Sequence, residues 1–557
     1  MMRRKMLTLS TLSRQDKIAL GVLALIALLG LLLRVGGIGW SLPDSRHPLA
    51  TYHPDELINL GAALSADIPH FQFDIGFYNY GAFYFYLVHF AHILGRGWGI
   101  IPSTPPSASS LDPAAATEQA ALFLAGRWVT VLLGVGTILA LYFLGRRLFG
   151  RKAGLIGAAL YAITPLAVIH SHFLTVDVPA TFFIVMALLW AVRLLERQDW
   201  ANYVWAGIWV GLATATKYTA CLVLIAPLLA HRYNQPEGAC QLHRKAHLSV
   251  LLVAVTFAFI IGCPGPLINW QAFWEGTYPG SGLRYELLEH SRNGHGDLFL
   301  DTGFGGWYHL VVSLRYGMGT PLLLLALFGL GYAVRRRTTG DKILLTFLLL
   351  SYLSVSFSAV RFARYMIPLL PILCLFGARW LCECCPDKQK ITFVFGGVVA
   401  LITLLSSGTY VRGMMAEDPR DSAERYLQAK SGSIIAFAKI PWFFSPPLSP
   451  LFGAPSAPQR MKAVEQTTQY QLKISTSEWD RTLLQTAPQL VIVSNIETMH
   501  AVTRLKQPEP TRFMEALNQS YNPTVFAPPY MASTANAPLI PEDILYIIPT
   551  ITVYERK

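Results

Sequence analysis

The sequence predicts a polytopic α-helical membrane protein that ends in a small α/β domain. Apolar residues occupy 53% of its 557 positions and charged residues only 14%, whereas soluble proteins average roughly 25% charged residues. The apolar residues gather in stretches long enough to cross a bilayer, and much of the Lys and Arg falls in the short loops between them. Basic residues in such loops set the orientation of a membrane protein. The net charge of +12 is therefore explained without a nucleic-acid partner, and none is expected.

The first span is predicted from Ile18 to Leu33, in an apolar run that continues to Trp40. Basic residues precede it, as in a secretory signal peptide, but the apolar core of such a peptide has only about 7–15 residues and ends at a cleavage site. The longer run predicts an uncleaved helix with its N-terminus in the cytoplasm. Arg34, near the outer end of this helix, is expected to extend to the interface with water.

The basic segment Arg146 to Lys152 sets the orientation of the spans around it. Basic loops stay in the cytoplasm. The span before this segment therefore runs toward the cytoplasm, and the span after it runs away from the cytoplasm. Alternation through the later basic loops gives a transmembrane domain at 1–413 in the plasma membrane (the inner membrane of a bacterium), with 39–119 and 414–557 extracytoplasmic. The eleven predicted spans are 18–33, 120–145, 154–171, 176–195, 203–216, 218–231, 248–268, 309–334, 342–359, 365–382 and 391–413.

Two segments need a separate interpretation. Residues 78–101 are apolar enough to cross, but a span there would invert every later helix, so we predict that they lie on the membrane surface with their aromatic rings at the interface. Residues 203–231 form two halves of about fourteen residues each, too short for about 30 Å of hydrocarbon. We expect short broken helices that meet at Lys217 near the outer face.

The extracytoplasmic tail is polar and of mixed predicted structure. A helix is expected after Asp418, and strands are expected at 433–437, 490–494 and 546–554, where β-branched and aromatic residues stand between Pro and polar residues. The Pro-rich stretch 441–458 is predicted to be a loop whose aromatic residues rest on the membrane or on the transmembrane domain. The tail is therefore expected to form a small α/β domain.

Charged and histidine side chains gather on the outer side once this topology is imposed. His53-Pro54-Asp55-Glu56 follows the first span, and an ionised carboxylate beside hydrocarbon is costly unless it is paired or wet. Asp177, Lys217 and Arg364 fall on the same side. Carboxylates that face Lys and Arg at a lipid boundary suit a reaction in which a lipid phosphate leaves and a hydroxyl loses a proton. Further candidates on this side are His172 and Tyr365.

Each candidate also has an ordinary structural interpretation. The acidic pair suits a solvated loop, and Asp177 can begin a helix. His172 can hydrogen-bond to loop backbone, while Arg364 with Tyr365 can anchor a helix at the interface. For each residue taken singly, both interpretations stay open.

Several motifs, in this order and topology, resemble one family. After the Asp-Glu pair and the aromatic surface segment come RRLFGRK at 146–152, HSHFLTVDVP at 170–179, TKYTA at 216–220 and RFARYMIPLLP at 361–371. Over roughly residues 18–413 the chain is similar to the bacterial lipid-carrier-dependent glycosyltransferases of family 39, relatives of the protein O-mannosyltransferases and of the lipid A aminoarabinose transferases, with the C-type glycosyltransferase fold. The chain departs from them at Asn79-Tyr80-Gly81-Ala82, where many members have a Pro-Pro pair after a basic residue.

The resemblance implies transfer of a hexosyl or pentosyl sugar from a polyprenyl-phosphate donor to a hydroxyl of a protein, lipid or glycan at the outer face, with inversion. It makes Asp55 the general base and Glu56 a supporting catalytic residue. The substrate-binding candidates are His53, His172, Asp177, Lys217, Arg364 and Tyr365, of which the two cations would neutralise the leaving phosphate.

No cofactor is expected besides the lipid-linked substrate. The outer loops lack the Asp-x-Asp motif of nucleotide-sugar enzymes, and the seven cysteines match no zinc-binding spacing; no metal site is predicted, and a need for a divalent ion is left open. Two alternatives remain: a transporter or flippase for lipid-linked sugars, and a polymerase or ligase for surface polysaccharide. A transporter would have inverted repeats and charges near the middle of the membrane, whereas the charges here gather at one face.

Overall fold

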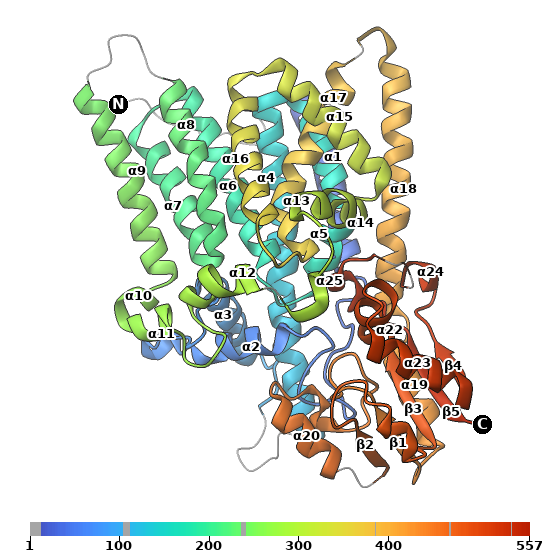
Figure 1. Ribbon diagram of the computed structural model, residues 1–557. Helices are drawn as coiled ribbons and strands as arrows, with labels where there is room; N and C mark the ends of the chain where they lie inside the picture. Colours follow the sequence, from blue (N-terminus) through green and yellow to red (C-terminus); the bar gives the residue numbers. More distant parts are fainter. Residues whose placement is uncertain are drawn as a thin grey trace.

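The computed structural model describes residues 13–103, 112–234, 241–293, 295–384, 386–466, 469–535, 537 and 539–557. Long helices run side by side in a bundle, and a domain that contains a β-sheet lies against one end of it (Figure 1). The longer helices of the bundle and its loops are α1 (Arg14–Val35), α2 (Glu56–Ser65), α3 (Phe83–Gly97), α4 (Pro113–Ala162), α6 (Asp177–Glu196), α7 (Trp200–Thr216), α8 (Ile225–Tyr233), α9 (Gln241–Gly262), α15 (Thr320–Arg336), α16 (Thr339–Ser356), α17 (Leu370–Glu383) and α18 (Gln389–Met415).

Shorter segments connect these helices. The short α-helices are α5 (Pro165–Ile169), α10 (Gly265–Ile268), α11 (Trp270–Trp274), α12 (Ser291–Asn293), α13 (Gly305–Tyr308) and α14 (Leu314–Met318). The 3₁₀ or π segments are η2 (Ile68–His70), η3 (His170–His172), η4 (Tyr218–Leu224), η5 (Tyr285–His290), η6 (Gly296–Phe299), η7 (His309–Ser313), η8 (Ala363–Leu369) and η9 (Pro386–Lys388).

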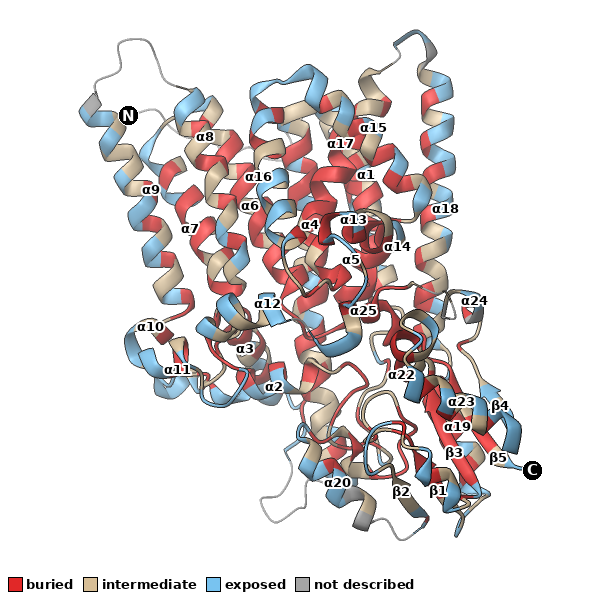
Figure 2. Cartoon of the chain, viewed as in Figure 1, coloured by how far each residue is buried: buried red, intermediate tan, exposed pale blue. Residues whose placement is uncertain are grey.

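The chain is a multi-pass membrane protein. Six helices among the described residues are long and apolar enough to cross a membrane, or up to seven if a bent pair counts as one span. α6 and the continuous η8–α17 segment are mostly buried inside the bundle, whereas α9 and α18 turn most of their apolar side chains outward (Figure 2). Apolar surface of this extent suits contact with lipid. The count of eleven spans stays a prediction.

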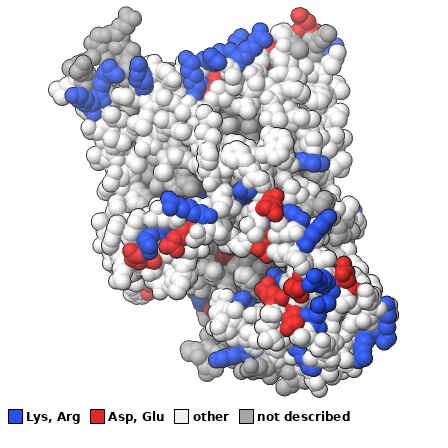
Figure 3. Space-filling view, viewed as in Figure 1, with Lys and Arg blue, Asp and Glu red and all other residues white. Residues whose placement is uncertain are grey.

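The predicted basic turn is present inside α4. Gly150 has φ +88°, which glycine adopts without strain, and the chain reverses there: a Cβ on Gly145 would lie 2.8 Å from the Cα of Gly154. In one continuous helix these two residues would be about 13.5 Å apart. Asp16 of α1 ties the turn, with its carboxylate 3.0 Å from both Arg146 and Arg151. Figure 3 shows Lys and Arg gathered along the end of the bundle opposite the sheet.

Two other expectations for the spans need correction. The segment predicted as the span 309–334 is not a single helix, because the chain bends by 119° between Gly305–Met318 and Thr320–Arg336. Gly319 at the bend has φ +77°, which a regular helix does not accommodate. Arg34 does not extend to the interface either. It is fully buried, and donates to the carbonyl oxygens of Gly30 and Ala162, each at 2.9 Å, because the chain after the basic turn packs over it.

The break at Lys217 is present, and the aromatic segment is a separate helix. Lys217 has extended backbone angles between α7 and η4. α3 lies with α2 at the end of the bundle near the sheet domain (Figure 1). Its Tyr84 and Phe85 are fully buried, while Phe90 and Trp98 are exposed. Its placement on a membrane surface stays a prediction.

The tail forms a five-stranded mixed sheet in the order β2-β1-β3-β5-β4, as predicted for an α/β fold. β1 (Ile434–Phe437) pairs in parallel with β2 (Gln471–Ile474) and β3 (Leu490–Ser494), and β5 (Ile551–Arg556) runs antiparallel to β3 and β4 (Tyr521–Phe526). The last strand begins later than predicted. The helical segments of the tail are α19 (Pro419–Gln428), η10 (Pro450–Gly453), α20 (Ala457–Gln466), α21 (Thr482–Gln485), α22 (Asn495–Thr498), η11 (Met499–Arg504), α23 (Pro508–Ser520), α24 (Ala532–Ala535) and α25 (Glu542–Leu545).

Arg420 joins the tail to the first outer loop. Its guanidinium is fully buried, forms two 2.7 Å hydrogen bonds to Asp418 and donates to the carbonyl oxygens of Phe443 and Tyr546. It also stacks 3.9 Å from the ring of Tyr52 in the first outer loop. Trp442 and Phe443 of the Pro-rich loop line a small space together with Thr51, His53 and Pro54 of the first outer loop.

Candidate active site

A cavity of about 410 Å³ lies where the first outer loop, the loop after α11, η8 and the tail meet. The carboxyl ends of the parallel strands β1 and β3 lead into its wall through Lys439 and Ile496. Its polar lining includes Asp55, Tyr80, Glu286, His290, His295 and Arg364, and its aromatic lining includes Phe77, Phe362, Trp442, Phe443, Phe444 and Tyr546. A carboxylate and a guanidinium thus face a space large enough for a small ligand.

Asp55 is positioned at the start of α2. It is the residue before the first helical turn, and its side chain makes no capping hydrogen bond, so it is free to point into the cavity. Its Oδ2 lies 3.1 Å from Nη2 of Arg364, and its side chain is 31% exposed. Burial disfavours ionisation, but the Arg364 guanidinium and nearby histidines outweigh it and hold the pKa of Asp55 below its usual range. At neutral pH this carboxylate is therefore ionised and able to accept a proton.

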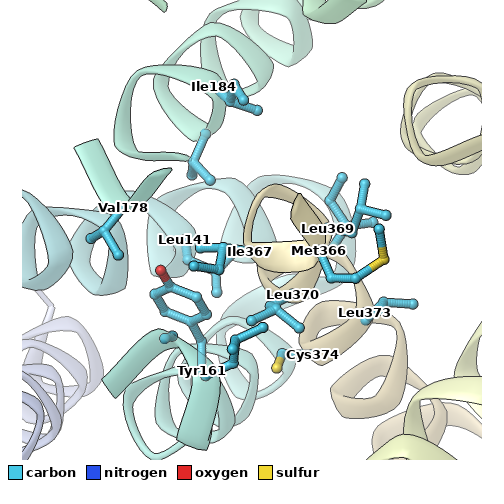
Figure 4. Close-up of a cluster of buried hydrophobic side chains, with 14 of the residues drawn as sticks. Leu141, Tyr161, Val178, Ile184, Met366, Ile367, Leu369, Leu370, Leu373 and Cys374 are labelled. Atoms are coloured by element: carbon cyan, nitrogen blue, oxygen red, sulfur yellow. The ribbon is translucent and has the colours of Figure 1, made fainter. Parts of the chain in front are cut away.

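Arg364 is held in η8 by a packed core. Figure 4 shows Met366, Ile367 and Leu370 pointing into a cluster with side chains of α4 and α6. The guanidinium lies 4.1 Å above the ring of Phe362. Its Nη1 is buried without a hydrogen-bond partner among the described residues. A buried guanidinium with an unused donor at a cavity is suited to bind an anion.

Lys217 and Asp177 form a second charged pair beside the cavity. Nζ of Lys217 lies 2.5 Å from Oδ1 of Asp177 and 4.8 Å from the centre of the Tyr365 ring. Asp177 also begins α6, so its structural interpretation holds as well. Lys217 and Tyr365 line a smaller space of about 170 Å³, which shares Asn79, Tyr80, Glu286 and His290 with the main cavity.

A third space, of about 30 Å³, adjoins the smaller one. It shares Lys217 and Tyr365 with the smaller space, and Ala180 and Ile184 of α6, Leu222 of η4 and Phe347 of α16 also line it. The three spaces thus extend from Asp55 and Arg364 near the tail to side chains of α6, η4 and α16 within the bundle.

Glu56 does not line the cavity, although it adjoins Asp55 in the sequence. It is fully buried and accepts four hydrogen bonds, at 2.6–2.9 Å, from the guanidinium of Arg127, the Thr51 hydroxyl and the backbone N–H of Leu174. Burial opposes its ionisation, but Arg127 outweighs burial and lowers the pKa of Glu56. This pair braces the first outer loop against α4.

Glu56→Gln is expected to lower the free energy of unfolding by about 3–5 kcal/mol, because it leaves Arg127 buried without its counter-ion. The folded pKa of Glu56 lies below its usual value of 4.5, so this stabilisation is present above that value and is lost as the pH falls through the folded pKa. Thermal unfolding at several pH values measures both effects. Glu196→Gln, which removes an exposed pair with Arg147, should change stability little. Equal stability of both variants would contradict the bracing role.

The two predicted histidines lie beneath the site. The two ring nitrogens of His172 face the carbonyl oxygens of Val168 and Gly36, at 2.9 and 2.8 Å, as in its structural interpretation. His53 is buried against Phe173, and its Nδ1 accepts the backbone N–H of Asp55 at 3.3 Å. Neither ring lines the main cavity. His53 therefore supports the backbone that carries Asp55.

The sequence did not single out the histidines that do line the cavity. Nε2 of His290 lies 2.6 Å from Nε2 of His295, and its Nδ1 lies 3.1 Å from Glu286. Burial, His290 and Arg364 lower the pKa of His295 to about 4, so its ring is neutral at pH 7. The only sequence signal was their place in the long outer loop 269–308. Nothing in the sequence indicated that tail residues such as Lys439, Ile496 and Tyr546 line the cavity.

Comparisons with known proteins agree with the motifs of the sequence. Residues 120–261 match the family model described as dolichyl-phosphate-mannose-protein mannosyltransferase. This match confirms, over that segment, the resemblance to family 39. A search of curated proteins found no match.

Solved structures gave weak similarities. The apo oligosaccharyltransferase of Archaeoglobus fulgidus has 14% identity and a TM-score of 0.46, over 86% of this chain and 70% of that chain. ArnT from Cupriavidus metallidurans, bound to undecaprenyl phosphate, has 12% identity and a TM-score of 0.47, over 97% and 98%. The S. cerevisiae Pmt1-Pmt2 O-mannosyltransferase complex, bound to its sugar donor, has 16% identity and a TM-score of 0.33, over 46% and 34%.

Proposed function

We propose that this protein is a glycosyltransferase that moves a hexosyl or pentosyl sugar from a polyprenyl-phosphate donor to an acceptor hydroxyl of a protein, lipid or glycan. The observation that carries the proposal is the pairing of Asp55 with Arg364 at the cavity, where a proton acceptor stands beside an anion-binding group. The family match supports it, because that family is described by a lipid-phosphate sugar donor.

The cavity system suggests how the donor lies. Its phosphate would bind the free donor of Arg364 and the ammonium group of Lys217, since charge-assisted hydrogen bonds to phosphate are strong. The polyprenyl chain would leave the smaller space toward the surrounding lipid. The sugar would then occupy the main cavity, beside Asp55.

The reaction would proceed as follows. Asp55 accepts the proton of the acceptor hydroxyl while the hydroxyl oxygen bonds to the anomeric carbon. The bond from that carbon to the phosphate oxygen breaks with inversion, and its electron pair leaves with polyprenyl phosphate. Arg364 and Lys217 stabilise the charge that develops on the phosphate. When the phosphate occupies Arg364, Asp55 loses part of the attraction that lowers its pKa and becomes a stronger base.

A panel of labelled polyprenyl-phosphate sugars tests the proposal. The purified protein should transfer label from at least one of them to a cell-envelope acceptor fraction, and should not use the matching nucleotide sugars. Transfer from nucleotide sugars alone would reject the lipid donor.

The proposed orientation places the N-terminus in the cytoplasm, the cavity and residues 414–557 outside, and the protein in the bacterial inner membrane. The gathering of Lys and Arg opposite the sheet supports it (Figure 3). With the native cysteines replaced, Glu509→Cys in the tail should react with an impermeant thiol reagent in cells whose outer barrier is opened, and Thr339→Cys should not. Both positions are exposed in the structure. Labelling of position 339 without position 509 would reverse the orientation.

A further inference from the structure

A carboxylate from the tail lies directly behind the segment that carries Arg364. Asp543 in α25 is fully buried, and accepts hydrogen bonds from the backbone N–H groups of Ala363 at 3.1 Å and Arg364 at 2.8 Å. Nε2 of His170 lies 3.6 Å from the same carboxylate. One side chain of the tail thus contacts two elements of the transmembrane domain.

These two hydrogen bonds replace a missing cap. The first backbone N–H groups of a helix have no partner within it, and a side chain just before the helix usually satisfies them. Phe362 stands at that position in η8 and provides no such side chain. Asp543 supplies it from a distant part of the chain, with one carboxylate oxygen for each N–H.

The position of Asp543 is itself fixed within the tail. Its neighbour Glu542 lies 2.7 Å from Nε2 of the buried His500. Three residues later, the carbonyl oxygen of Tyr546 accepts from Arg420 at 2.9 Å. Arg504 also binds the carbonyl oxygens of the outer loop at residues 297–300. The tail is therefore docked on several sides of the segment that holds Asp543.

We propose that Asp543 is a positioning residue that sets Arg364 for the lipid phosphate, so that donor binding requires the tail to be docked. This rests on the proposed function. The hydrogen bond to Asp543 fixes the backbone of Arg364. The guanidinium of Arg364 then lies 3.1 Å from the carboxylate of Asp55. Phosphate binding at Arg364 and docking of the tail accordingly stabilise each other, because linkage between two equilibria is reciprocal.

Two substitutions test this from opposite sides. Asp543→Asn keeps the size of the side chain but has one acceptor oxygen, so one backbone N–H loses its partner. Ala363→Pro removes an N–H and leaves Asp543 intact; proline is tolerated at the first helical position, and Phe362 already has the extended angles that precede proline. We expect Asp543→Asn to weaken binding of undecaprenyl phosphate about tenfold, as for a buried N–H left without its partner, and Ala363→Pro to weaken it less. KM for the donor should rise more than kcat falls.

Asp341→Asn is the matched control. Asp341 is also fully buried and accepts a backbone N–H at a helix start, but it pairs with Arg379, near the end of α17 that is remote from Arg364. This variant should lose stability and keep donor affinity. Unchanged affinity in both Asp543→Asn and Ala363→Pro would overturn the positioning role. Wild-type protein that binds undecaprenyl phosphate yet transfers no sugar would defeat the proposed function alone.

Discussion

Asp55→Asn is expected to lower the rate of sugar transfer by about 10²–10⁴, the usual contribution of a general base, while the donor stays bound. Asparagine keeps the shape of the side chain and can still accept a hydrogen bond, but it cannot take the proton of the acceptor hydroxyl. The loss should therefore fall on kcat. Transfer and donor binding, measured in the same detergent, separate the two effects.

The control for this variant is another aspartate of the same loop. Asp44 is also partly exposed and paired with an arginine, Arg46 at 2.5 Å, but it does not line the main cavity. Asp44→Asn should transfer sugar at close to the wild-type rate. Near-normal transfer by Asp55→Asn would exclude Asp55 as the general base. Loss of donor binding in that variant would assign Asp55 a role in binding instead.

Arg364→Lys is expected to weaken donor binding by about 10- to 100-fold, since a hydrogen bond to a charged group contributes roughly 1.5–3 kcal/mol. Lysine keeps the positive charge but loses the planar fork that can bind phosphate while another nitrogen meets Asp55. Titration with undecaprenyl phosphate measures the change. Arg361→Lys, at a neighbouring residue outside the main cavity, should bind the lipid as wild type does. Full turnover by Arg364→Ala would exclude this residue from the site.

The sequence named both residues of the central pair but did not predict that they meet. Asp55 and Arg364 were both candidates, and so were Lys217 and Asp177, and each pair lies within hydrogen-bonding distance. Glu56 was grouped with Asp55 because the two are adjacent. Successive residues at a helix start point about 100° apart, so one carboxylate faces the cavity while the other enters the bundle.

Long-range contacts explain what the sequence did not reveal. Asp543 follows Arg364 by 179 residues, and no local pattern links a buried aspartate of the tail to a helix start in the bundle. The β1 and β3 strands were predictable from their β-branched runs, but not that their ends form a wall of the cavity. The bend at Gly319 was missed because apolar composition alone does not distinguish a straight span from a bent one.

Proteoliposomes that contain a polyprenyl-phosphate sugar labelled on both sugar and lipid test the central claim most directly. The claim is that the Asp55 site breaks the bond between sugar and phosphate. With acceptor present, wild-type protein should separate the two labels, giving glycosylated acceptor and free polyprenyl phosphate, and Asp55→Asn should leave them joined on bound donor. If the intact doubly labelled lipid instead moved between the leaflets and the bond stayed whole, the protein would be a transporter and the account of its site would be contradicted.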